Sequence, residues 1–161
     1  MTHMTDANAH QPAPLRISRT FPAPRTAVFA AWSTADRVKR WFSPETYTVS
    51  DATVDLRAGG AFDICMRAPD GTEHWMRGTF VEVTPHSRLV FASQVSDSDG
   101  NPLFSVRTEV DFSDAPGGTQ MDILQTYTFI DPSIAGPMVG GASEGWRSTL
   151  DNLEREVMIS M

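Results

Sequence analysis

Six consecutive segments between Tyr47 and Ile130 alternate apolar and polar residues with a period of two, and this run constrains the fold more than any other feature. Connections rich in glycine, proline and aspartate separate the segments, and no helical pattern fits between them. Such a run is typical of an antiparallel meander. The predicted strands are residues 47–56, 61–68, 73–83, 88–95, 103–112 and 119–130, with another of the same alternation at 15–21.

Helical patterns flank this run of strands. Residues 25–32 and 33–42 predict two short helices between the first two strands, because Pro24 suits a first helical turn and Ser33 or Thr34 can cap the second helix. An antiparallel sheet must cover its apolar face with another element. Near the C-terminus, Trp146, Leu150, Leu153 and Val157 form the apolar stripe of a long helix that can do so. We therefore predict an α+β fold, with a curved antiparallel sheet of about seven strands wrapped around this helix.

Three glycines stand just before that stripe, at Gly140, Gly141 and Gly145. Their spacing matches a phosphate-binding loop, but Trp146 and Arg147 stand where such a loop has lysine and then serine or threonine. A phosphate loop also follows a strand of a parallel sheet, and the predicted sheet is antiparallel. Each glycine costs about 1 kcal/mol inside a helix. We therefore expect a frayed or bent first turn that leads into the helix and gates a cavity mouth.

The charge and composition exclude several classes of partner and location. A net charge of −7 opposes non-specific binding to nucleic acid or to an anionic membrane. The single cysteine, Cys65, cannot form an internal disulfide. Residues 1–14 are polar, contain His3 and His10, and lack the pattern of a signal peptide, so we expect a flexible tail followed by one domain over 15–160. No apolar stretch reaches the length of a membrane span, and the expected location is the cytoplasm.

Charged residues indicate which face of each strand points to the core. Outward Arg107 and Glu109 place Thr108 inside, and outward Asp122 places Gln125 and Tyr127 inside. In 88–95 both faces are apolar, and we assign Leu89, Phe91 and Ser93 to the inside.

The strand predicted at 73–83 is assigned from its own polar residues. His74 and Glu82 are assigned to the outside. The alternation then places Phe80 outside as well, and Trp75 and Arg77 inside. An inward arginine must be paired or face water. Two interpretations stay open: an ion pair of Arg77 within a filled core, or a cavity whose few polar groups orient a ligand.

Catalytic and metal-binding motifs are not recognised in the sequence. His74 and His86 are isolated, and one cysteine offers no pair of thiolates, so no metal site and no cofactor are expected. No G-x-S-x-G nucleophile elbow occurs.

Several segments, in their order, resemble the START-like (SRPBCC) superfamily with its helix-grip fold. Within it they are similar to single-domain homologues of the C-terminal domain of the activator of the heat-shock-protein-90 ATPase. Relatives often carry a histidine on the strand after "GGT", where this chain has Gln125. The matching segments cover roughly residues 15–157 and include "RTFPAPRTAVFAAW" (19–32), "VKRWFSP" (38–44), "VDLRAGGAFDICM" (54–66), "PDG" (69–71), "GTFVEVTPHSRLVF" (78–91), "GGTQMDILQ" (117–125) and "GWRSTLDNLE" (145–154).

The resemblance implies a cavity between the sheet and the last helix that binds a small apolar or amphipathic molecule. Polar groups of Arg77, Gln125 and Tyr127 are expected to orient this ligand. The complete set of expected ligand-binding residues is Phe62, Ile64, Met66, Trp75, Arg77, Phe91, Ser93, Thr108, Gln125, Tyr127, Trp146 and Leu150.

Two other functions are implied by the same resemblance. An enzyme of the polyketide cyclase or dehydratase kind needs an acid or base, for which Tyr127 is a candidate, while the strand carboxylates are expected outside. A co-chaperone acting on a heat-shock-protein-90-type ATPase in a stress response is the third possibility, although the activator's N-terminal domain has no counterpart in these 161 residues. A homodimer is also expected, because the sheet edges and the outward Val90, Ala92 and Phe80 need cover.

Overall fold

The computed structural model of the chain describes residues 13–44, 46–97, 99–130 and 135–159, and only the backbone for residues 135–140. Apart from its last two residues, the predicted tail over residues 1–14 lies outside this range, as do His3 and His10.

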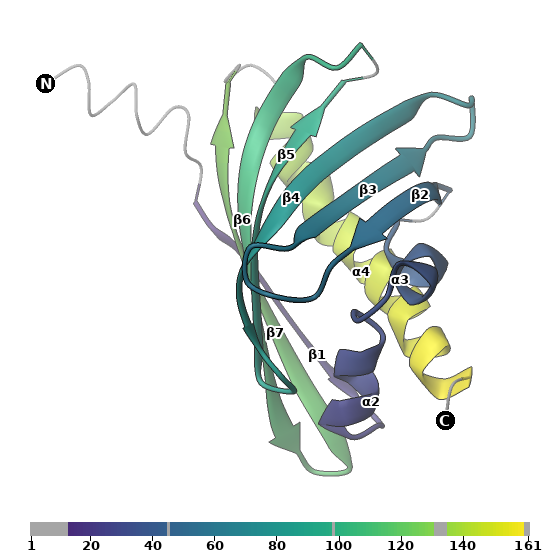
Figure 1. The fold of residues 1–161 in the computed structure, drawn as a ribbon, viewed down its shortest axis with the longest axis vertical. Coiled ribbons are helices and arrows are strands. Elements are labelled where there is room, and N and C mark those ends of the chain that lie inside the picture. The colour runs from purple at the N-terminus through teal and green to yellow at the C-terminus, as the bar shows by residue number, and fades with distance from the viewer. Residues whose placement is uncertain (1–12, 45, 98, 131–134, 160–161) are drawn as a thin grey trace, which may run out of the picture.

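Within the described residues, seven strands form one antiparallel sheet in the order β1-β7-β6-β5-β4-β3-β2, and three helices lie on one side of it (Figure 1). The prediction of an α+β helix-grip fold is confirmed, with two short helices between the first two strands. The elements are β1 (Leu15–Phe21), α2 (Arg25–Ala30), α3 (Ala35–Trp41), β2 (Thr48–Val54), β3 (Ala61–Arg67), β4 (Glu73–Thr84), β5 (Arg88–Ser96), β6 (Pro102–Ala115), β7 (Gly118–Phe129) and α4 (Ala135–Ile159).

The main core lies between the inner face of the sheet and the C-terminal half of α4. Leu150 and Leu153 of α4 are almost fully buried there, together with Phe62 and Phe91 of the sheet. Burying side chains of this size contributes about 1.5–3 kcal/mol each. The curvature of the sheet seen in Figure 1 follows from wrapping this apolar face around one helix.

A buried ion pair fixes α4 against α3. The Glu156 carboxylate of α4 is 6% exposed, and it accepts a hydrogen bond from Arg37 Nε at 2.7 Å. Arg40 Nη1 approaches the same oxygen at 3.3 Å. Two arginines on one side of α3 therefore neutralise a carboxylate that its burial would otherwise make costly.

A β-bulge in β4 reverses the faces that we predicted for most of this strand. The register with β5 shifts between Phe80 and Glu82, so the residues before Val81 and those after it follow opposite alternation. Phe80 is 1% exposed and lies in the core, whereas Arg77 is exposed. The inward placement of Trp75 and Arg77 and the outward placement of Phe80 are therefore wrong.

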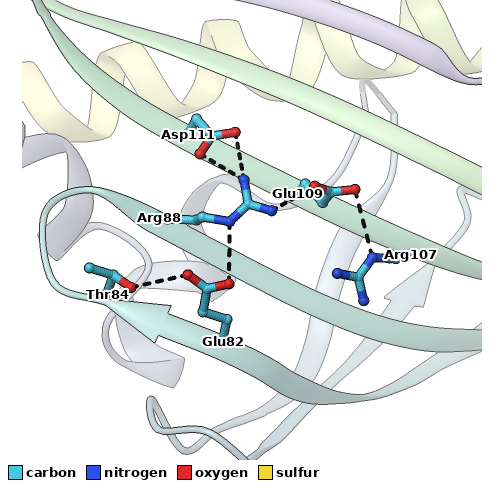
Figure 2. Close-up of polar contacts among 6 residues, drawn as sticks. All are labelled: Glu82, Thr84, Arg88, Arg107, Glu109 and Asp111. Carbon is cyan, nitrogen blue, oxygen red and sulfur yellow. Dashed lines mark hydrogen bonds and ion pairs between the residues drawn. The ribbon is translucent and has the colours of Figure 1, made fainter.

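The outer face of the sheet carries ion pairs over the buried Val90 of β5. Figure 2 shows Arg88 beside Asp111 and Glu109, with nitrogen–oxygen distances of 2.8 Å and 2.6 Å. Val90 pairs with Glu82 and Glu109 in the register, so the aliphatic stems of these long side chains cover it. Of the three outward apolar residues that we predicted, only Ala92 is both outward and exposed. The prediction of a homodimer is left with the sheet edges as its basis.

Helix α4 begins well before its apolar stripe and includes the three glycines. It runs without interruption from Ala135 to Ile159, so Gly140, Gly141 and Gly145 are helical rather than a lead-in to the helix. Our prediction of where this helix starts is therefore wrong. Helix propensity is a weak term that tertiary context overrides. A Cβ on Gly145 would lie 3.7 Å from Pro44 Cβ, and one on Gly141 would meet nothing within 4 Å.

We expect Gly141→Ala to stabilise the protein by roughly 0.5–1 kcal/mol, because alanine loses less backbone freedom in a helix and its methyl group meets open space here. Urea denaturation monitored by circular dichroism measures the change. Gly117→Ala is the matched control: its φ of +78° disfavours a side chain, and we expect a loss of about 1 kcal/mol. A loss of stability in Gly141→Ala would contradict a continuous helix at this position.

Candidate functional site

Three buried polar residues, Ser93, Thr108 and Gln125, interrupt the apolar inner face of the sheet; we call them the polar seam. Thr108 of β6 and Gln125 of β7 are direct partners in the register. On one side of the seam lies the main core. On the other side is a second apolar cluster, formed by Phe104, Val106, Tyr127 and Phe129 and contacted by Ala142 of α4. The seam therefore divides the interior into two apolar regions.

The side-chain amide of Gln125 is the centre of the hydrogen bonds at the seam. Its oxygen accepts from the Tyr127 hydroxyl at 2.5 Å and from the Trp146 indole nitrogen at 2.7 Å. Its nitrogen donates to Thr108 Oγ1 at 3.0 Å. An amide oxygen has two lone pairs, so both are used. The seam thus connects β6, β7 and α4 through one side chain.

Trp146 joins the seam to the aromatic cluster at the end of α3. Its indole is half-buried and packs edge-on against Phe42, with ring centroids 6.0 Å apart. Phe42 in turn contacts Phe62 of β3, with centroids 5.5 Å apart. The indole therefore spans from the seam to the aromatic core, and moving it changes contacts on both sides.

Tyr127 points its hydroxyl at the seam while its ring belongs to the second cluster. Burial raises the pKa of Tyr127 to about 12. At neutral pH the phenol is therefore protonated, which agrees with its donating a hydrogen bond to Gln125. The centroid of its ring lies 5.9 Å from those of Phe104 and Phe129.

The Ser93 hydroxyl is the unsatisfied member of the seam. Ser93 is 6% exposed, and its Oγ has no hydrogen-bond partner among the residues that the structure describes. The register places it between Gly78 of β4 and Val106 of β6, next to the second cluster. A buried polar group without a partner costs about 1–3 kcal/mol. Its donor and its acceptor lone pairs are therefore unused in the described structure.

Ten of the twelve residues that we predicted to bind a ligand lie on the inner face of the sheet or on the side of α4 that faces it. Trp75 and Arg77 do not: they lie on the outer face, where the Arg77 guanidinium stacks 4.1 Å from the Trp75 ring centroid. The inner positions of β4 are instead taken by residues that include Met76 and Phe80. The ten are Phe62, Ile64, Met66, Phe91, Ser93, Thr108, Gln125, Tyr127, Trp146 and Leu150.

The described ranges contain neither a metal-ligand grouping nor a membrane-spanning helix. There, no three or more histidine, cysteine, aspartate or glutamate side chains gather as a metal site would require. None of the helices in these ranges has the length and apolar character needed to cross a bilayer.

Comparison with known proteins identifies the family. The family described as Activator of Hsp90 ATPase homolog 1-like protein matches residues 22–158. The chain belongs to this family. Ligands are commonly bound within the fold of the Hsp90-activator-like family. No curated protein sequence matches the chain significantly.

Solved structures of similar proteins have the same fold. An uncharacterised protein from Rhizobium leguminosarum is 28% identical, with 91% of this chain and 94% of that chain covered and a TM-score of 0.77. A protein from Nitrosomonas europaea is 25% identical, with 92% and 96% covered and a TM-score of 0.76. The AHSA1 protein from Silicibacter pomeroyi is 24% identical, with 92% and 100% covered and a TM-score of 0.76.

We expect Gln125→Leu to lower the free energy of unfolding by roughly 2–4 kcal/mol, because it leaves the Tyr127 hydroxyl, the Trp146 indole and Thr108 without their partner. Tyr127→Phe removes a single hydrogen bond, and its expected cost is about 1 kcal/mol. Thr126→Val, on the exposed outer face of the same strand, is the control and should change stability by less than about 0.5 kcal/mol. If Gln125→Leu and Thr126→Val change the free energy of unfolding equally, the hydrogen bonds of the seam do not stabilise the fold as we expect.

The stability of the protein should fall as the pH rises from 10 towards 12. The folded-state pKa of Tyr127, about 12, lies above the ordinary value of 10.0, so the folded state retains a proton that the unfolded state releases in this window. The stabilising contribution of the buried Tyr127 is fully present below pH 10, and about 1 kcal/mol of it is lost by pH 11. Urea denaturation at pH 9 and pH 11 measures it, and Tyr127→Phe should lose less stability over this range than the unmodified protein. An identical loss in both would contradict a buried, neutral Tyr127.

Proposed function

We propose that this protein binds a small apolar or amphipathic molecule between the inner face of the sheet and α4. The observation that supports this most directly is the buried Ser93 hydroxyl, which has no partner in the described residues and adjoins an apolar cluster. Ligand sites typically combine apolar walls with a few well-placed polar groups. The second cluster and the polar seam have this combination.

The chemistry of the seam indicates how the ligand would be oriented. Phe104, Val106 and Phe129 would contact its apolar part. Its polar end would be a hydroxyl or carbonyl group, because Ser93 can donate to either and, among the described residues, the seam and the second cluster contain no positively charged side chain to neutralise an anion. An amphipathic molecule with a neutral polar end therefore suits the site better than a fatty acid anion.

Trp146 would adjust to the ligand. Its hydrogen bond to Gln125 joins α4 to the seam at 2.7 Å, and the indole remains half-buried. A ligand at the second cluster would either pack against this indole or displace it. In both cases the indole N–H of Trp146 reports binding.

A screen of sterols, aromatic polyketides and long-chain alcohols tests the proposal by native mass spectrometry and thermal shift. We expect at least one class to bind, to raise the melting temperature and to shift the indole N–H resonance of Trp146. Ser93→Ala should weaken that binding about tenfold, the effect of losing one hydrogen bond.

Ser105→Ala is the matched control, because Ser105 lies on the neighbouring strand but faces outward. It should bind like the unmodified protein. The proposal fails if no class stabilises the protein, or if binding is the same in Ser93→Ala.

The two alternative functions, an enzyme and a co-chaperone, would be revealed by different measurements. Tyr127 is the acid–base candidate on the inner face, yet its pKa of about 12 makes it a weak acid at neutral pH, and Gln125 accepts its hydrogen bond. Turnover would appear in the same mass spectra as a changed ligand mass. Stimulation of an Hsp90-type ATPase by the isolated protein would support the co-chaperone instead.

A further inference from the structure

A hollow of about 750 Å³ opens on the outer face of the sheet, on the side away from α4. Its floor includes Gly78 and the exposed Ala92. Asp63, Arg77, Gln94 and Arg107 are among the side chains around it. Short side chains in the middle of the face, with long ones beside them, produce the depression. Ser93 of the seam and Val106 of the second cluster also line the hollow, although both residues are buried.

Arg77 is a preorganised cation at this hollow. Its guanidinium stacks on the Trp75 ring with Cζ 4.1 Å from the ring centroid, which restricts its orientation. Among the residues that the structure describes, it has no carboxylate partner and no hydrogen-bond acceptor. All its N–H donors are therefore available to a ligand.

Arg107 is the second cation, and its pairing is weak. Its Nε lies 3.7 Å from a Glu109 oxygen, beyond hydrogen-bond range. Glu109 is held more closely by Arg88, at 2.6 Å, as Figure 2 shows. Arg107 therefore also has unused donors, in a protein whose net charge is −7.

The register places the two arginines within reach of one small molecule. Arg77 of β4 aligns with Gln94 of β5 and Ser105 of β6, and Arg107 lies two residues beyond Ser105. Two strand spacings and two residues along a strand separate the two Cα atoms by about 12 Å. Long side chains starting this far apart can converge on a molecule the size of a monosaccharide.

Neutral and acidic groups between the arginines define the rest of the ligand. Asp63 lines the hollow and accepts a hydrogen bond from the backbone N–H of Gly78 at 3.1 Å, which fixes its carboxylate. The amide of Gln94 and the hydroxyls of Thr126 and Thr128 add further donors and acceptors. This set matches several hydroxyl groups, while the arginines match a carboxylate or phosphate.

We propose that the hollow binds a small hydroxylated anion, a sugar acid or sugar phosphate, with its charged group on Arg77 and Arg107 and its hydroxyl groups on Asp63 and Gln94. This proposal does not rest on ligand binding between the sheet and α4.

Titration of the ¹⁵N-labelled protein with glucuronate and with glucose 6-phosphate tests the site by amide chemical shifts. We expect saturable shifts at Ala92, Gln94 and Ser105 at millimolar concentrations, and none along α4. Arg77→Gln and Arg107→Gln should each weaken binding tenfold or more, as expected for a lost charge-assisted hydrogen bond. Arg155→Gln, which removes an exposed arginine from α4, is the control and should bind normally.

Neutral glucose and inorganic phosphate complete the test. The proposal is overturned if neither anionic sugar gives saturable shifts at the hollow, or if glucose binds equally well. It is also overturned if inorganic phosphate matches the sugar phosphate, or if Arg155→Gln weakens binding as much as Arg77→Gln does. Unchanged spectra of the free variants show that the fold is intact, and a failure here leaves the seam experiments unaffected.

Discussion

The amide of Gln125 holds together the interior on which the rest of the structure depends. Its three hydrogen bonds join β6, β7 and α4 at the line that separates the two apolar regions. Apolar contacts alone do not fix the position of a helix along a sheet, because they are non-directional. The hydrogen bond from Trp146 is directional and helps to fix it, as does the bond from Arg19 of β1 to Asp151 of α4 at 2.7 Å. The amide is uncharged, so this directional link adds no buried charge to an apolar interior.

One bulge decides which chemistry each face of the sheet presents. Because β4 shifts register at Val81, Phe80 joins the core, whereas Arg77 and Trp75 join the outer face. If the strand alternated without the bulge, the guanidinium of Arg77 would lie in the apolar interior. That would cost several kcal/mol unless the guanidinium were paired. The bulge therefore keeps the inner face free of this charge, and it also creates the stacked arginine beside the outer hollow.

The sequence was sufficient to predict the strands, the helix-grip fold and most of the inner face. Strands such as β6 and β7 have charged residues that mark one face along their whole length, so Thr108 and Gln125 could be assigned correctly. In β4 the charged residues conflict, because Arg77 and Glu82 fall on opposite faces of a regular strand, and the prediction followed Glu82 rather than inserting a bulge between them. The start of α4 was also missed, because the low helix propensity of glycine is a weak local term that does not decide where a helix begins.

The contrast between the two faces explains why one sheet can offer two different kinds of site. On the inner face, the raised pKa of Tyr127 and the buried amide of Gln125 show an environment that favours neutral groups, so a molecule bound there gains from apolar contact. On the outer face, Arg77 and Arg107 are exposed, and solvent supports the charges that their ligand would bring. A molecule suited to one face would bind poorly to the other, because an anion resists burial and an apolar molecule gains little affinity on an open polar surface. The two faces would therefore favour ligands of opposite character.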